Sequence, residues 1–219
     1  MKKFLLIGAV LLLIAGCVEK PQPEPTDAQK FKEAYEALNG QENSSGQPHK
    51  TLEIAEDNPM YYATQEEIEN ILTSDTGIIF FGFPECPWCR NTLPVFLEAC
   101  EQEIVTRVYY FNNVEERNTM EWQDGKAVET KQGSDGYYRL LELMGEWTSV
   151  YDGMEDESIR RIYFPTYVFV KDGKIVDIQV SSLDSVEDPR ADLTEQQHQE
   201  LFDLFVEKIR SAKACDDKC

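Results

Sequence analysis

Residues 77–89 read GIIFFGFPECPWC, and this stretch decides the fold. Residues 77–83 form a continuous apolar run of strand length, which is the pattern of a strand buried on both faces of a sheet. Two cysteines, Cys86 and Cys89, follow shortly after this run, and Pro87 stands directly after the first. The pattern predicts a helix from Pro87 to about Gln102. Proline suits the first turn of a helix because its missing N–H has no partner there. The sequence therefore predicts a buried strand that turns into a helix at a pair of cysteines.

Cys86 and Cys89 are the candidate catalytic residues. At the N-cap of a helix, the Cys86 sulfur lies against unpaired backbone N–H groups and the positive end of the helix dipole, and both favour the thiolate. Cys89 falls one turn further along, close enough to form a disulfide with Cys86. The predicted roles are an attacking thiol at Cys86 and a resolving thiol at Cys89, with a mixed disulfide to the substrate between the two steps. We expect no dissociable cofactor, because the disulfide itself carries the electrons.

The same spacing of two cysteines is also half of a zinc site. Zinc needs two further ligands, commonly a second close pair of cysteines or histidines. The remaining candidate zinc ligands are not spaced from the motif as a zinc site requires. They are His49, His198, Cys100, Cys215 and Cys219. We therefore expect no metal at the motif and interpret Cys100 as a buried structural thiol. Glu85 and Arg90 flank the motif with opposite charges, and we expect both to be exposed and solvated.

The rest of the chain supplies alternating strands and helices around this unit. The order strand, helix, strand over residues 77–111 favours a parallel pair of strands with a crossover helix. Asp172-Gly173 is a two-residue hairpin signal between two apolar runs. The expected elements are helices at 29–38, 64–72 and 194–213, and strands at 51–54, 104–111, 167–170 and 174–180.

Residues 112–163 separate the two halves of this pattern. Their centre carries apolar and aromatic residues at helical spacing, so we expect a helical insertion that packs on the core. This stripe consists of Tyr137, Leu140, Leu141, Met144, Trp147 and Tyr151. The acidic residues within 152–157 lack the spacing of an EF-hand and indicate a solvated loop.

The chain resembles a thioredoxin-fold protein. The resemblance rests on the buried strand, the Cys-x-x-Cys motif, Pro94 in the following helix, and a Phe-Pro-Thr run at 164–166 directly before a strand. It implies an α/β fold of three layers, with a central mixed sheet flanked by helices and the insertion placed before the cis-proline strand. It also implies that Pro165 is cis and faces the dithiol. Trp88, Phe164 and Pro165 would then form the substrate face, where substrate pairs as an added strand.

A finer resemblance concerns the segments 57–59 and 81–90 and the long insertion. They are similar to extracytoplasmic thioredoxin-like proteins of the bacteriocin-transport-accessory type in Gram-positive bacteria, a group associated with forming or correcting disulfides in exported peptides. One departure from thioredoxins is Phe80, which stands six positions before the first cysteine. Thioredoxins usually bury an acidic residue there that helps to deprotonate the resolving thiol. The direction of electron flow, oxidation or isomerisation against reduction, therefore stays open.

The first 17 residues are typical of a targeting signal. Residues 1–3 are a short basic region, and the apolar run 4–14 spans only about 16 Å as a helix, too short for a bilayer core of roughly 30 Å. The run ends LIAGC at 13–17, which resembles a bacterial lipobox and implies that Cys17 is acylated as a lipid anchor. The expected organisation is a signal peptide and lipobox at 1–17, a Pro-rich stalk and helix at 18–49, a thioredoxin-like domain at 50–213 and a cysteine-containing tail at 214–219.

Charge and cysteine content bound the partners. The chain of 219 residues has 41 acidic and 21 basic residues and a net charge of −20, which excludes binding to a nucleic-acid backbone. We expect a lipid-anchored protein outside the cytoplasm, at a Gram-positive cell membrane, where thiol–disulfide chemistry is permitted. Its partners would be exported protein or peptide thiols, a membrane or extracytoplasmic redox partner, and the membrane itself through the lipid anchor. Cys215 and Cys219 are a candidate second redox pair, a metal-binding pair or an oxidised tail. The alternative function is a non-catalytic lipoprotein that binds a peptide or a metal.

Overall fold

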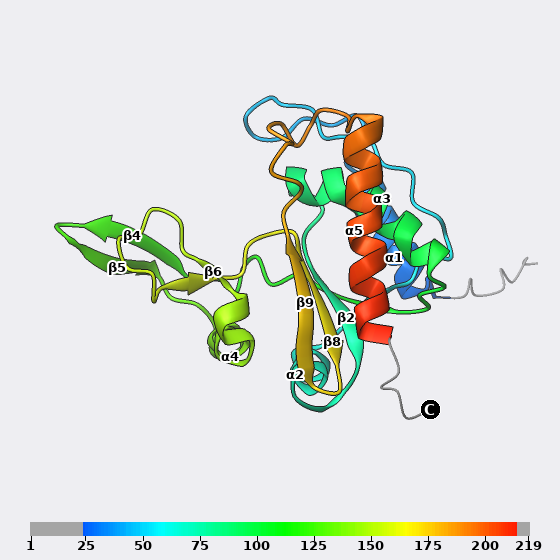
Figure 1. Ribbon diagram of the computed structural model, residues 1–219. Helices are drawn as coiled ribbons and strands as arrows, with labels where there is room; N and C mark the ends of the chain where they lie inside the picture. The colour runs from blue at the N-terminus through cyan, green and yellow to red at the C-terminus, as the bar shows by residue number, and fades with distance from the viewer. Residues whose placement is uncertain (1–23, 214–219) are drawn as a thin grey trace, which may run out of the picture.

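A five-stranded mixed sheet organises the chain in the computed structural model, in which residues 24–213 are described (Figure 1). The first three strands in spatial order, β1, β3 and β2, are parallel, and β8 and β9 are antiparallel to their neighbours. The spatial order is β1-β3-β2-β8-β9. The strands are β1 (Met60–Tyr62), β2 (Gly77–Phe81), β3 (Val108–Phe111), β8 (Thr166–Lys171) and β9 (Lys174–Val180).

Helices cover both faces of this sheet. Helices α3 and α5 pack against each other on one face, where α1 also lies, and α2 packs with α4 on the opposite face. The helices are α1 (Asp27–Glu36), α2 (Gln65–Ser74), α3 (Pro87–Gln102), α4 (Asp135–Met144) and α5 (Glu195–Lys213). Three layers around a sheet of this strand order constitute a thioredoxin-like fold, so the predicted fold class is confirmed.

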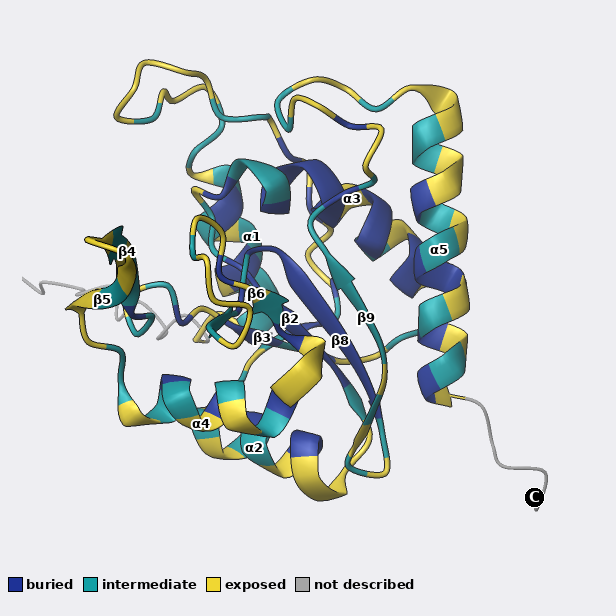
Figure 2. Cartoon of the chain, turned by 60° about the vertical axis from the view of Figure 1, so that its left-hand side comes forward, coloured by how far each residue is buried: buried dark blue, intermediate teal, exposed yellow. Residues whose placement is uncertain are grey.

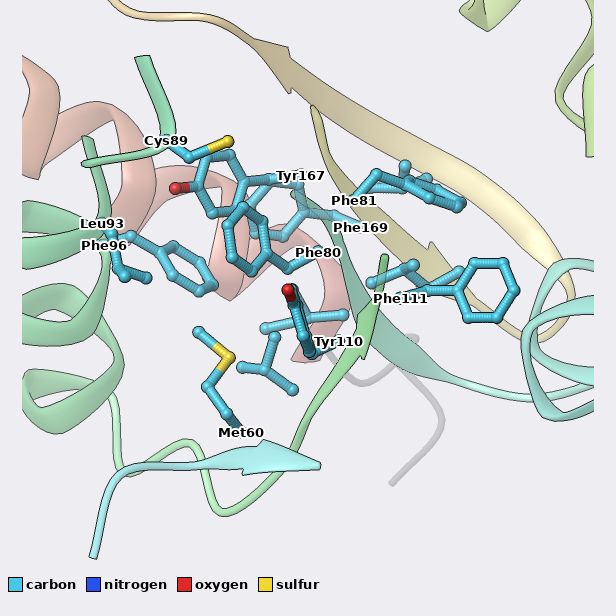
Figure 3. Close-up of a cluster of buried hydrophobic side chains, with 14 of the residues drawn as sticks. Met60, Phe80, Phe81, Cys89, Leu93, Phe96, Tyr110, Phe111, Tyr167 and Phe169 are labelled. Carbon is cyan, nitrogen blue, oxygen red and sulfur yellow. The ribbon is translucent and has the colours of Figure 1, made fainter. Parts of the chain in front are cut away.

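Strand β2 is buried on both sides, as its continuous apolar run predicts. Phe80 points to the face of α3, where its ring stacks on Tyr167 at 4.7 Å between centroids and lies 6.4 Å from Phe96. Phe81 points to the other face and meets Phe111 edge-on at 6.2 Å. Figure 3 shows these rings filling the space around the sheet. The position of β2 in the middle of the core fixes where the chain leaves the sheet at residue 81.

Two predicted element boundaries are confirmed, the start of α2 and the turn between β8 and β9. The Thr64 hydroxyl accepts a hydrogen bond from the Glu67 N–H while the Glu67 carboxylate accepts from the Thr64 N–H, and this capping box starts α2 close to the predicted residue 64. Asp172 and Gly173 turn the β8–β9 hairpin with φ of 49° and 71°. Both residues tolerate this left-handed conformation, which explains the sharp turn.

The predicted strand at 51–54 is wrong. Leu52 and Ile54 are buried, as their alternation suggests, but the first strand is Met60–Tyr62. The Asn39 side chain instead bonds both the N–H and the carbonyl of Leu52, and the Glu36 carboxylate accepts from the Ile54 N–H. Side chains of the N-terminal segment thus take the place of a neighbouring strand. Strand β3 is also shorter than the predicted 104–111, and Ile104 has a φ of 54°.

The insertion at 112–163 is only partly helical, which corrects the prediction of a helical insertion. The stripe residues Tyr137, Leu140 and Met144 are buried on α4, but the helix ends at Gly145, whose φ is 49°. Trp147 follows in a 3-10 turn and is 41% exposed, so it does not pack on the core as predicted. The remainder forms two hairpins, made of β4 (Thr119–Gln123) with β5 (Lys126–Lys131) and β6 (Ser149–Val150) with β7 (Arg160–Arg161).

The β4–β5 hairpin projects away from the sheet in Figure 1, and Figure 2 shows that much of it is exposed while β2 and β8 are buried. Its turn, Asp124-Gly125, has φ of 50° and 76°, the same two-residue pattern as the β8–β9 turn. The acidic residues within 152–157 are exposed, as predicted for a solvated loop.

We predict that Gly82→Ala destabilises the fold by about 1–3 kcal/mol. A Cβ at Gly82 would lie 2.4 Å from the Cζ atom of Phe80, and that ring is held between Tyr167 and Phe96. Urea unfolding of the variant measures the change in the free energy of unfolding. A stability equal to that of the unsubstituted chain would show that the Phe80 ring moves aside freely.

Candidate active site

Cys86 is the N-cap of α3, and its sulfur replaces the usual oxygen cap. The Cys89 N–H donates a hydrogen bond to the Cys86 Sγ at 3.1 Å, and Pro87 occupies the first turn as predicted. Cys86 retains 4% exposure whereas Cys89 has none, and both are free thiols. Because Cys86 alone of the two reaches the surface, the geometry suits it for attack and Cys89 for resolution.

The Phe164–Pro165 peptide bond is cis, as the resemblance implies, and it lies against the dithiol. Antiparallel pairing sets Thr166 of β8 opposite Phe81 at the end of β2, so the segment before β8 meets the loop after β2. The Cys86 thiol donates a hydrogen bond of 3.6 Å to the Phe164 carbonyl. Two motifs almost 80 residues apart in sequence are thereby brought together.

Aromatic rings border this contact. The Phe164 ring packs edge-on against Phe83 at 5.3 Å between centroids. Trp88 is half-buried in the first turn of α3, and it packs against the core. Trp88 lies within the motif, and Phe164 and Pro165 lie beside it. Their role in substrate binding stays a prediction.

Cys89 is fully buried on the inner side of α3, and Figure 3 shows its side chain next to the Tyr167 ring. Burial raises the pKa of the Cys89 thiol well above its ordinary value, and the neighbouring Cys86 raises it further. Phe80, fully buried and stacked on Tyr167, fills the position where thioredoxins usually bury an acidic residue. The Tyr167 hydroxyl pairs with that of Thr92 at 2.9 Å, and burial raises the pKa of Tyr167 strongly.

Arg90, expected to be exposed, is completely buried directly after the motif. Its guanidinium donates to the carbonyls of Tyr35 at 2.8 Å, Lys50 at 2.8 Å and Pro84 at 3.2 Å, and to the Asn39 side-chain oxygen at 2.9 Å. Burial lowers its pKa, an effect opposed by Tyr35 and Glu85. These bonds join the loop before Cys86 to the segment that follows α1. Arg90 is therefore a positioning residue of the site.

Sequence reasoning missed this role because an arginine beside an exposed motif normally remains in solvent. The acceptors come from three separate segments, around residues 35–39, 50 and 84, and no local pattern connects them. Glu85, by contrast, is exposed as expected.

The remaining predicted residues lie apart from the site or outside the described residues. Cys100 is buried on α3, as predicted, and burial raises the pKa of its thiol. Cys17, Cys215 and Cys219 lie outside residues 24–213. Within that range, no three histidine, cysteine or acidic side chains are gathered as metal ligands would be. In the same range, no helix combines the length and apolar character needed to cross a membrane.

Comparison with known proteins finds distant similarity among solved structures. No protein-family model and no curated protein matches the chain. Among solved structures, the chain is similar to a thioredoxin from Aeropyrum pernix, with 20% sequence identity over 68% of this chain and 84% of that one, and a TM-score of 0.35. The assignment to the thioredoxin-like class rests on the strand order of the sheet and on the dithiol helix that follows β2.

We predict that Arg90→Met destabilises the protein by about 3 kcal/mol, because several buried acceptors lose their donor. The matched control is Arg139→Met, which removes an exposed ion pair with Glu142 and changes stability by less than about 1 kcal/mol. Urea unfolding of both variants measures the two changes. Equal effects would contradict the positioning role of Arg90.

Proposed function

We propose that this chain is a thiol–disulfide oxidoreductase whose redox centre is the Cys86/Cys89 pair. The observation that carries the proposal is the contact of 3.6 Å between the thiol of Cys86 and the carbonyl of Phe164, the residue before a cis proline. It places a surface-reaching thiol at a helix N-terminus beside a backbone segment that can pair with substrate. Thiolate character and access are what make a cysteine reactive.

Reduction of a substrate disulfide would take two balanced steps. The Cys86 thiolate attacks one substrate sulfur, the substrate S–S bond breaks, and the other substrate sulfur leaves as a thiolate that takes a proton from solvent. Cys89 then gives up its proton and attacks the Cys86 sulfur, which releases the second substrate thiolate. The dithiol has passed two electrons to the substrate and is left as a disulfide. Oxidation of a substrate dithiol is the reverse sequence.

The proposed substrates are cysteines of exported proteins or peptides. An extended segment would pair with the backbone at Phe164 as an added strand, over a face formed by Trp88 and Pro165. The lipobox-like sequence that ends at Cys17 supports a lipid anchor on the outer side of a Gram-positive membrane. An extracytoplasmic dithiol or disulfide partner would regenerate the pair. The finer assignment to the bacteriocin-transport-accessory type rests on the sequence resemblance alone.

We predict that Cys86→Ser abolishes exchange with a disulfide substrate, while Cys89→Ser accumulates mixed disulfides that cannot be resolved. Cys100→Ser is the control and keeps full activity, since that thiol is buried away from the motif. Turnover of a disulfide peptide and mass spectrometry of alkylated protein measure both effects.

Exchange that survives Cys86→Ser would reject the proposal. A pair that equilibrates with neither glutathione nor dithiothreitol would instead favour the non-catalytic binding protein. The equilibrium potential then decides the direction: a value near about −270 mV indicates a reductase, and one of about −180 to −120 mV an isomerase or oxidase.

We also predict that resolution by Cys89 accelerates with pH. Its pKa is raised mainly by burial, which persists when Cys86 is in a mixed disulfide, so its thiolate fraction is small at neutral pH. That fraction, and with it the rate, should rise about tenfold per pH unit until the raised pKa is reached. Stopped-flow decay of a preformed Cys86 mixed disulfide between pH 6 and 9 measures the slope. A rate independent of pH over this range would show that a proton acceptor is already in place.

A further inference from the structure

Two arginines of the insertion, Arg117 and Arg161, lie beside the segment that precedes the cis proline. The Arg117 guanidinium carbon is 4.1 Å from the centroid of the Phe164 ring, and its Nη1 donates to the Ile162 carbonyl at 3.3 Å. The Arg161 guanidinium lies 4.4 Å from the Tyr151 ring centroid and 5.9 Å from that of Tyr163. Together they border the backbone at 162–164, which leads directly into Pro165.

Neither arginine has a carboxylate at ion-pair distance among residues 24–213, in a chain with 41 acidic and 21 basic residues. Arg139, in the same insertion, does pair with Glu142 at 2.7 Å. Arg117 and Arg161 each give one Nη1 bond to a backbone carbonyl, the latter to Asn118 at 3.2 Å. The Nε of Arg117 is buried without a hydrogen-bond partner. Both cations therefore keep donors that no group of the described chain uses.

The two guanidinium groups also act on each other. Burial lowers the pKa of Arg117, and the charge of Arg161 lowers it further, so the two cations repel. Tyrosine and phenylalanine faces beneath them compensate part of this cost. An anion placed between the two guanidinium groups would relieve the repulsion and accept hydrogen bonds from N–H groups that have no partner. A planar carboxylate matches the fork of a guanidinium better than a spherical anion does.

We propose that Arg117 and Arg161 select substrates that carry an aspartate or glutamate within a few residues of the reacting cysteine. The proposal rests on the proposed function and names the substrate class for that site. A substrate strand paired along Phe164 places alternate side chains on one face, about 7 Å apart. A side chain two positions from the cysteine would thus be within reach of residues that border 162–164. The net charge of −20 repels an acidic peptide as a whole, so any preference for one must arise locally.

The test compares two peptides that differ only in glutamate or glutamine two residues before a single cysteine. Each cysteine is activated as a 2-pyridyl disulfide, and the release of 2-thiopyridone by reduced full-length protein gives a second-order rate constant. Subtracting the rate of the Cys86→Ser protein removes the contribution of every other thiol. We expect the glutamate peptide to react about fivefold faster at low ionic strength, with the preference lost in 1 M salt.

Arg117→Gln and Arg161→Gln should each reduce this preference, taken as the ratio of the two rate constants, below about twofold. Arg139→Gln removes the same charge from α4 and should leave the preference intact. Arg161 contacts the rings of Tyr151 and Tyr163 and not that of Phe164, so its variant keeps the test decisive if Arg117→Gln does not fold.

Equal rates for the two peptides, or a preference that survives both substitutions, would overturn the inference while leaving the oxidoreductase function in place. Reaction with neither peptide would overturn the proposed function itself. The two failures are therefore distinguishable in one experiment.

Discussion

The hydrogen bond from the Cys89 N–H to the Cys86 sulfur, at 3.1 Å, is the contact on which the site depends. It makes one atom both the cap of helix α3 and the proposed attacking thiol. The position of that atom follows from β2, which is held between β3 on one side and β8 on the other. The pairing of Phe81 with Thr166 then brings the Phe164 carbonyl to the sulfur. A change in the end of β2 would move the helix cap, the Cys86 sulfur and the segment before the cis proline together.

The parts of this arrangement that follow from local signals could be predicted from the sequence. The apolar run at 77–83, the proline after Cys86 and the Asp172-Gly173 turn each act within a few residues, and their elements were correctly predicted. The contact between Cys86 and Phe164 came only from the resemblance, because no local signal joins them. The burial of Arg90 and the mixed structure of the insertion were missed. Arg90 depends on carbonyls from three segments, and the β4–β5 strands alternate too weakly to distinguish them from loops.

The distribution of cations gives the site its electrostatic character. The chain as a whole is strongly acidic, yet Arg90 is buried directly after the motif, and Arg117 and Arg161 border the segment before the cis proline. Around Cys89, in contrast, Phe80 and Tyr167 supply an apolar environment that disfavours its thiolate. The two thiols of one motif thus occupy different surroundings: Cys86 keeps a small exposed fraction at the helix N-terminus, and Cys89 is enclosed by rings. This asymmetry suits them to different steps.

The bonds of Arg90 to Tyr35, Asn39 and Lys50 have a thermodynamic consequence. They couple the docking of the N-terminal segment to the helix that carries both thiols. Linkage is reciprocal. If the N-terminal segment docks with different free energies in the dithiol and disulfide states, its docking shifts the equilibrium between those states by the same free energy. A partner or tether that pulls on residues 27–50 would therefore act on the redox equilibrium from a distance, as an effector would.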